Sequence, residues 1–198
     1  MEIVAATKNK HKIQEIEKIT SEFGISIISR DKVIDPDLEI LEDGETFQEN
    51  SLKKAVEIMK LCSMTAISDD SGLMVDALDG APGVISARFA GDDASDLENN
   101  NKLLELLKGI PMEKRTAKFV SVITLAFADG KVIQTYGECR GHIIFEEKGK
   151  NGFGYDPLFV PIGFEKTFAE LSGEEKNKIS HRAKALAELR IKLNFKLR

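Results

Sequence analysis

The sequence predicts an α/β fold whose sheet is partly antiparallel. Short apolar runs of strand character alternate with segments of helical periodicity along all 198 residues. Two long β-rich runs flank the dipeptide Asp129-Gly130, which is the strongest short hairpin signal in the chain. No repeat, low-complexity tract or flexible linker interrupts this pattern, so we expect one domain over residues 1–198.

The first third of the chain predicts alternating strands and helices. Ile13, Ile16 and Ile19 lie on one stripe of the first helix, which Gly24 ends. Thr46 precedes a glutamate by three residues, the spacing of a capping box, and therefore starts the second helix. The expected elements are a strand at 2–7, a helix at 9–23, a strand at 25–29, an acidic loop at 31–44 and a helix from 46 to about 62.

The rest of the chain continues the mixed pattern. Two further strands, at 65–68 and 72–78, are expected on either side of the adjacent acids Asp69 and Asp70. Ser95 or Asp96 can cap a leucine-rich helix that Gly109 ends. The remaining expected elements are a turn at 79–83, the two strands around the hairpin, a glycine-rich loop at 149–157 and a last helix from about 180 to 193.

Composition excludes several classes of protein. Apolar residues make up 42% and charged residues 31%, a balance that can build a sizeable core, and the net charge of −5 argues against general affinity for nucleic acid. No apolar run approaches the roughly 20 residues of a membrane span, and the N-terminus lacks a signal peptide. Cys62 and Cys139 lie in unrelated contexts, so we interpret them as reduced thiols of a cytoplasmic protein.

The segment TKNKHK lies at the junction of the first strand and the first helix. A helix start directs free N–H groups and a positive dipole end at a ligand above the strand, and phosphate is the ligand most often bound there. Thr7 and Asn9 offer hydrogen bonds, while Lys8, Lys10 and Lys12 supply positive charge. The alternative is a capped helix with a solvated basic first turn, and the P-loop pattern is absent from the chain.

Two acidic segments could hold a metal ion. Burial of Asp69 or Asp70 requires a cation or a proton, and Mg²⁺ accepts one or two carboxylates together with substrate phosphates. One acid could instead orient water as a base, or the pair could simply form a turn before Gly72. Glu42 precedes the second helix, which carries Lys54, and the alternative there is a helix with a charged outer face.

Two further segments could contact a nucleotide. In GFGYDP the glycines allow a close backbone approach, and Phe153 and Tyr155 offer flat surfaces on which a base could stack. Asp156 would otherwise belong to a turn before proline. In KISHRAK, His181 and Arg182 occupy the first turn of a helix, which disfavours cations unless an anionic group lies nearby. Together these segments supply the parts of a site for a nucleotide polyphosphate.

The whole chain resembles the inosine triphosphate pyrophosphatase family, whose members are also called Ham1-like or RdgB-like. The resemblance rests on the motifs TKNKHK, EDGETFQENSLKKA, SDDSGLMVDALDGAPGVISARFAG, GFGYDPLF and EEKNKISHRAKAL in order and spacing. It implies a long twisted mixed sheet with flanking helices, two lobes around a central cleft, and a cytoplasmic homodimer. The implied activity is Mg²⁺-dependent hydrolysis of ITP, dITP and XTP to the monophosphate and pyrophosphate, without nucleic-acid or membrane partners.

The resemblance also implies roles for individual residues. It assigns the catalytic base to Asp70, and metal binding to Asp70, Glu42 and Asp69. Substrate contacts fall on matched positions along the chain: Thr7, Lys8, Asn9, Lys10, His11, Lys12, Lys54, Ser71, Phe153, Gly154, Tyr155, Asp156, Lys176, His181 and Arg182. The leading rival is a nucleotide-binding module without turnover. A phosphatase or kinase is disfavoured, because neither a P-loop nor the kinase signatures occur in the sequence.

Overall fold

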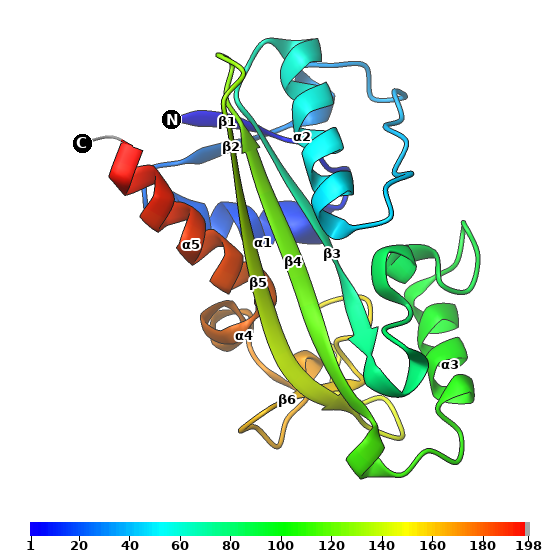
Figure 1. Ribbon diagram of the computed structural model, residues 1–198. Coiled ribbons are helices and arrows are strands. Elements are labelled where there is room, and N and C mark those ends of the chain that lie inside the picture. Colours follow the sequence, from blue (N-terminus) through cyan, green and yellow to red (C-terminus); the bar gives the residue numbers. More distant parts are fainter. Residues whose placement is uncertain (197–198) are drawn as a thin grey trace. The chain divides into compact units, whose positions relative to one another are not determined.

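The computed structural model describes residues 1–196 (Figure 1). The strands are β1 (Glu2–Ala5), β2 (Ser26–Ser29), β3 (Ala66–Val75), β4 (Thr116–Ala126), β5 (Val132–Ile143) and β6 (Phe159–Pro161). The helices are α1 (Lys10–Ser21), α2 (Phe47–Cys62), α3 (Asp96–Leu106), α4 (Gly173–Ile179) and α5 (His181–Lys196). The six strands form one sheet in the order β2-β1-β3-β4-β5-β6. Strand β1 is parallel to β2 and β3, whereas β5 and β6 are antiparallel, which confirms the predicted α/β class with a mixed sheet.

The chain divides into two compact units, each built from separate stretches of sequence. The first comprises Met1–Asp70, Ser121–Gly137 and the chain from Arg182 onward. The second comprises Ser71–Val120 and Glu138–His181. Strands β3, β4 and β5 thus contribute residues to both units, and each unit has its own apolar core. The central cleft implied by the resemblance stays a prediction.

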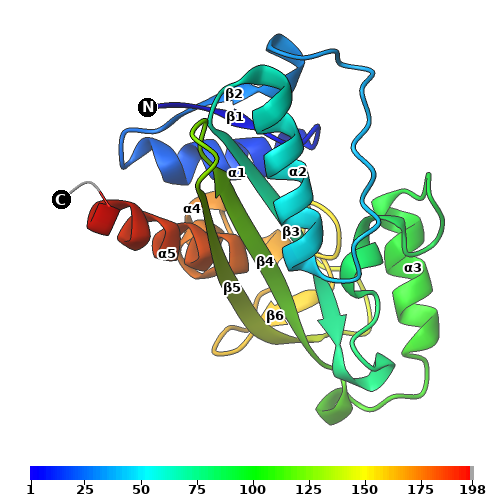
Figure 2. The same ribbon diagram turned by 45° about the horizontal axis from the view of Figure 1, so that its top comes forward.

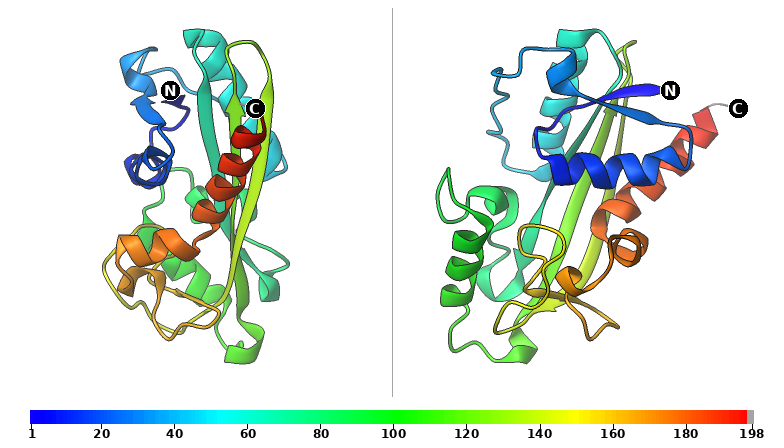
Figure 3. Two further views of the ribbon diagram at one scale, coloured as in Figure 1. Left: turned by 90° about the vertical axis from the view of Figure 1, so that its left-hand side faces the viewer. Right: turned by 180° about the vertical axis from the view of Figure 1, so that it is seen from behind.

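In the first unit, helices cover both faces of the sheet (Figure 2). Side chains alternate along the strands, so Ile3 and Ile67 belong to one apolar cluster while Val4 and Ala66 belong to another. The cluster beneath α2 is completed by Ala55, Ile58, Met59 and Ala126. The cluster beneath α1 and α5 is completed by Ile16, Ile25, Ile123, Ile133, Leu125, Ala185, Leu186, Leu189 and Leu193. Figure 3 (right) shows α1 and α5 on one side of these strands and α2 on the other.

Strand β3 corrects the sequence prediction at its most informative point. We expected two separate strands, at 65–68 and 72–78, on either side of the adjacent acids. The structure instead runs one strand through both, from Ala66 to Val75. Consecutive side chains of a strand point to opposite faces, so Asp69 and Asp70 lie on different sides of the sheet.

The local signals at helix ends and at the hairpin are confirmed. Asn9 caps α1, and Thr46 forms a reciprocal capping box with Glu49 at the start of α2. Ser95, rather than Asp96, caps α3. The turn between β4 and β5 places Gly130 at φ 86°, a conformation that glycine adopts without strain.

The second unit packs α3, the glycine-rich loop and β6 around one core. Leu103 and Leu107 from α3 and its end, Tyr155 from the loop, Phe159 from β6 and Phe168 form this core together with other buried side chains. The short elements β6 and α4 were not predicted from the sequence. No helix within residues 1–196 is long and apolar enough to cross a membrane. Cys62 and Cys139 are both free thiols, as expected.

Candidate active site

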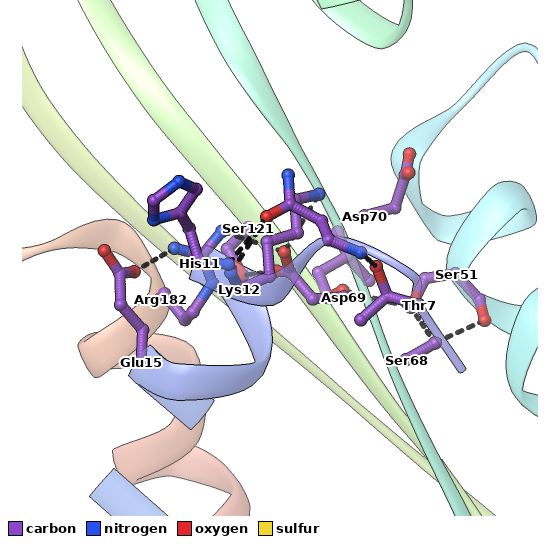
Figure 4. Close-up of polar contacts among 12 residues, drawn as sticks. Thr7, His11, Lys12, Glu15, Ser51, Ser68, Asp69, Asp70, Ser121 and Arg182 are labelled. Carbon is purple, nitrogen blue, oxygen red and sulfur yellow. Dashed lines mark hydrogen bonds and ion pairs between the residues drawn. The ribbon is translucent and has the colours of Figure 1, made fainter. Parts of the chain in front are cut away.

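Asp69 is the anionic centre of a buried network in the first unit (Figure 4). Its Oδ2 accepts a hydrogen bond from Arg182 Nη2 at 2.9 Å and lies 3.1 Å from Lys12 Nζ. Its Oδ1 accepts a hydrogen bond from Ser121 Oγ at 2.5 Å. Complete burial would raise the pKa of Asp69, but Arg182 and Lys12 outweigh it and hold that pKa well below its usual range. Asp69 is therefore an ionised carboxylate with two cations at Oδ2 and a hydroxyl at Oδ1.

Arg182 connects this network to α1. Its Nη1 forms an ion pair with Glu15, so the guanidinium lies between two carboxylates. Burial would lower the pKa of Arg182, but Asp69 and Glu15 raise it above its ordinary value. This explains how a cation can occupy the first turn of α5, the feature that made Arg182 conspicuous in the sequence. Sequence reasoning missed Glu15 and Ser121, because neither stands out from its neighbours.

Asp70 forms a second charged group with α2 and the acidic loop. Lys54 Nζ donates to Asp70 Oδ1 at 2.7 Å and to Glu42 Oε2 at 3.0 Å. Asp70 Oδ2 is buried and has no hydrogen-bond partner. Burial and then the nearby Glu42 raise the pKa of Asp70, although Lys54 and Lys12 act against them. Burial would also raise the pKa of Glu42, but Lys54 lowers it below its usual value.

Buried hydroxyl groups hold α2 against the sheet beside these charges. Ser51 Oγ lies 2.8 Å from both Ser68 Oγ and Thr124 Oγ1, and Ser68 Oγ donates to the Ser51 carbonyl at 2.6 Å. Ser51 is one turn before Lys54, and Ser68 is two residues before Asp70 on the same face of β3. The hydroxyl contacts thus fix the register in which Lys54 meets Asp70.

The loop that carries Glu42 is tied to the same helix. Asn50 Oδ1 accepts the Gly44 N–H at 2.8 Å, and Asn50 Nδ2 donates to the Gly44 carbonyl at 3.3 Å. A Cβ on Gly44 would lie 2.7 Å from Asn50 Oδ1, so only glycine permits this approach. The contact places Glu42 within reach of Lys54.

Asn9 caps the start of α1, where the sequence predicted a phosphate site. Asn9 Oδ1 accepts the N–H groups of His11 and Lys12 at 3.0 and 3.1 Å, and Thr7 Oγ1 accepts the Asn9 N–H at 3.1 Å. The cap thus occupies two of the amides that a phosphate could use. The side chains that remain exposed at this end are Lys8, Asn9, Lys10 and His11, while Thr7 and Lys12 are half-buried.

A separate group of predicted residues gathers in the second unit. Lys176 Nζ donates to Asp156 Oδ2 at 2.6 Å, and both side chains are buried. The same ammonium lies 5.0 Å from the centroid of the half-buried Phe153 ring, a cation–π distance. The Phe153 N–H donates to Asp156 Oδ2 at 3.0 Å. The buried His181 ring stacks on Phe119, with centroids 4.8 Å apart.

The position of Tyr155 changes one predicted assignment. The Tyr155 ring is buried in the core of the second unit, and its hydroxyl donates to the Ser86 carbonyl at 2.8 Å. It therefore offers no surface for stacking, contrary to expectation, whereas Phe153 does. Asp69 was expected among the metal ligands, and its oxygens contact Arg182, Lys12 and Ser121; a metal-binding role for it stays a prediction. Ser71 is half-buried on β3.

Of the three predicted metal ligands, Asp70 and Glu42 both lie at Lys54 Nζ, and the metal site itself stays a prediction. Within residues 1–196, no three His, Cys, Asp or Glu side chains converge on a point where they could together hold a metal ion. Asp70 and Glu42 both contact Lys54 Nζ, and Asp70 Oδ2 is an orphaned buried acceptor. Two carboxylates match the donor set of Mg²⁺ when substrate phosphates complete the shell.

Solved structures with the same fold carry Ham1 names. The Ham1 protein of Staphylococcus aureus is 40% identical, with a TM-score of 0.87 over 99% of this chain and 100% of that one. The HAM1 protein of Coxiella burnetii is also 40% identical, with a TM-score of 0.86 over 98% of each chain. The dITP/XTP pyrophosphatase of Desulfotalea psychrophila is 50% identical over 188 residues, which cover 95% of this chain and 83% of the relative.

The fold is therefore that of the solved Ham1 proteins. The sequence model of the Ham1 family matches residues 3–192. The chain belongs to the Ham1 family.

Proposed function

We propose that this protein is a nucleoside triphosphate pyrophosphatase that hydrolyses dITP, ITP and XTP to the monophosphate and pyrophosphate. The observation that carries the proposal is the buried Asp70 carboxylate, which has one oxygen without a hydrogen-bond partner and lies beside Glu42 and Lys54. Such a group can hold water or a cation against a polyphosphate. The 50% identity to a dITP/XTP pyrophosphatase supports the same substrate class.

We propose that Asp70 and Glu42 hold Mg²⁺ together with the substrate phosphates. Both carboxylates lie at Lys54 Nζ, and the free Asp70 Oδ2 gives a hard oxygen donor of the kind that Mg²⁺ prefers. A bound ion would neutralise charge on the triphosphate. Asp69 has a different role in this proposal, because its contacts hold Lys12 and Arg182 in place.

The chain's own residues would perform the hydrolysis by positioning and charge stabilisation. Asp70 orients the attacking water and accepts its proton. Lys54 and Lys12 stabilise negative charge on the phosphates. Attack at the α-phosphorus then breaks the bond to the β-phosphate, and pyrophosphate leaves.

We assign recognition of the base to Phe153, Asp156 and Lys176, with His181 as a further contact; Arg182 is already held between Asp69 and Glu15. Hypoxanthine and xanthine carry a carbonyl at C6, where adenine carries an amino group. A donor such as Lys176 favours the carbonyl, and a site built on hydrogen bonds can reject the wrong partner by about 10⁴-fold. Phe153 supplies a half-buried ring for stacking.

Product analysis tests the proposal. The purified protein is incubated with Mg²⁺ and, separately, with ITP, dITP, XTP, GTP and ATP, and the monophosphate, pyrophosphate and orthophosphate are measured. We expect equal amounts of monophosphate and pyrophosphate from the first three and little from ATP. Release of orthophosphate, or no turnover of any of the five, would refute the function.

A binding module without turnover is the rival hypothesis, and Asp70→Asn separates the two. We expect this variant to bind ITP but to lose hydrolysis. Equal hydrolysis by the variant and the wild type would exclude Asp70 as the base.

The family resemblance also leads us to propose a cytoplasmic homodimer. Sedimentation equilibrium would test the dimer.

A further inference from the structure

We propose that Asp96 and Asn100 of α3 are positioning residues for the nucleotide-binding loop at 149–157, and that they act by holding the peptide groups on both sides of Gly154. The inference rests on the proposed function for its consequence, a nucleotide base held by this loop. Its structural part stands on contacts within the second unit alone.

The two side chains bind opposite sides of one glycine. Asp96 Oδ2 accepts the Gly154 N–H at 2.7 Å. Asn100 Nδ2 donates to the Gly154 carbonyl at 3.2 Å and to Glu147 Oε1 at 2.7 Å. Asp96 and Asn100 are four residues apart, so they lie on one face of α3 and can reach the two peptide groups that flank Gly154.

The loop requires such an attachment because its backbone is unusually free. Gly149, Gly152 and Gly154 all adopt left-handed conformations, with φ values of 86°, 76° and 61°. Glycine populates many other conformations with similar ease, so the sequence alone does not hold this shape. The loop is fixed at its far side by Asp156, which binds the Phe153 N–H and Lys176. The contacts from α3 fix Gly154, which lies between Phe153 and Asp156.

Asn100 uses its amide nitrogen to hold the loop, while its amide oxygen has no hydrogen-bond partner. It is 2% exposed, and its two side-chain hydrogen bonds use the amide nitrogen. Its Oδ1 is buried without a hydrogen-bond partner. A buried orphan acceptor is unfavourable, so the side chain is better explained by what its two N–H groups hold than by general packing.

Phe153 is the residue through which these contacts would affect binding of the base. It directly precedes Gly154, and its ring lies over Lys176. Loss of the Gly154 contacts should let the peptide before Gly154 rotate, and the ring of Phe153 would move with it. The base would then lose its stacking partner, while the charged groups around Asp70 keep their own contacts.

Asp96→Ala tests the proposal with a matched series of variants. Asp96 is exposed, so its replacement should leave the fold intact. Asp96→Asn retains an acceptor for the Gly154 N–H, and Asp93→Ala removes an exposed acid next to α3 that has no such contact. Three quantities are measured: hydrogen exchange of the Gly154 amide by NMR, KM and kcat with ITP, and inhibition by tripolyphosphate, which has no base.

In Asp96→Ala we expect faster exchange of the Gly154 amide and a KM for ITP about tenfold higher, the equivalent of one lost hydrogen bond. The kcat and the inhibition constant of tripolyphosphate should stay within about twofold, because phosphate contacts are unchanged. Asp96→Asn and Asp93→Ala should match the wild type in all three measurements.

Three results would overturn the inference. Unchanged exchange at Gly154 would show that Asp96 does not hold the loop. Faster exchange with an unchanged KM would leave the contact structural only, and a parallel loss of affinity for ITP and tripolyphosphate would indicate a general defect. Failure of the wild type to hydrolyse ITP would refute the proposed function instead, and the exchange of Gly154 would still decide whether the loop is held.

Discussion

Replacement of Asp69 by asparagine should destabilise the protein strongly although the shape of the side chain is kept. The carboxylate is fully buried and faces Arg182 and Lys12. Removing one partner from a buried ion pair costs about 3–5 kcal/mol, because the remaining charge loses its compensation. With an unfolding entropy of about 2.1 cal/mol/K per residue, this cost lowers Tm by about 7–12 °C for a chain of 198 residues.

Thermal unfolding followed by circular dichroism at pH 7 measures this effect. Asp37→Asn is the matched control, because Asp37 is exposed and such substitutions change the free energy of unfolding by about 0.5 kcal/mol or less. A Tm for Asp69→Asn within about 2 °C of the wild type would contradict the importance that we give to the buried network.

The same pair of proteins gives a pH dependence with a defined sign. The folded-state pKa of Asp69 lies well below its ordinary value of 3.8. A depressed carboxyl pKa stabilises the fold above the unfolded pKa, and that stabilisation is lost as pH falls through the folded pKa. The Tm difference between the wild type and Asp69→Asn should thus be constant from about pH 8 to 5 and shrink below about pH 4. A difference that grew in acid would contradict the sign.

Three further substitutions test the neighbouring groups. Asp70→Asn should lower kcat by about 10²–10⁴-fold and lower Tm less than Asp69→Asn does, because Lys54 keeps Glu42 as a partner and burial raises the pKa of Asp70; a drop in Tm as large as that of Asp69→Asn would contradict this. Lys54→Met should remove activity and cost about 3–5 kcal/mol in urea unfolding, since it strips Asp70 and Glu42 of their shared cation. Ser51→Ala should cost about 1–3 kcal/mol in the same assay, because the buried hydroxyls of Ser68 and Thr124 lose a partner, and an unchanged midpoint would argue against the hydroxyl contacts.

Features that depend on local sequence could be predicted well. The pair Thr46 and Glu49 caps α2 as expected, because a cap is decided within four residues of chain. The turn at Gly130 also follows from local backbone preference. The identity of most candidate site residues, by contrast, came from the family resemblance rather than from local physics.

Features that depend on distant partners could not be predicted. Two adjacent acids look like a turn, and strand β3 can carry both only because Arg182 and Lys12 meet Asp69 on one face while Lys54 meets Asp70. No pattern in the sequence predicts that Lys12 or Arg182 will lie near Asp69.

Tyr155 illustrates the same limit for an aromatic residue. Its place between glycine and aspartate suggested a stacking surface, but the core around Phe159 buries its ring. The contact that decides its position is the hydrogen bond to Ser86, which lies 69 residues away in the chain. Burial of an aromatic side chain depends on packing that spacing alone does not encode.

Hydrolysis in ¹⁸O-labelled water tests most directly whether the group formed by Asp70, Glu42 and Lys54 directs water to the α-phosphorus. The protein is incubated with ITP and Mg²⁺ in labelled water, and the products are analysed by mass spectrometry. We predict one labelled oxygen in inosine monophosphate and none in pyrophosphate. Label in pyrophosphate or orthophosphate, or the absence of any turnover, would contradict the account.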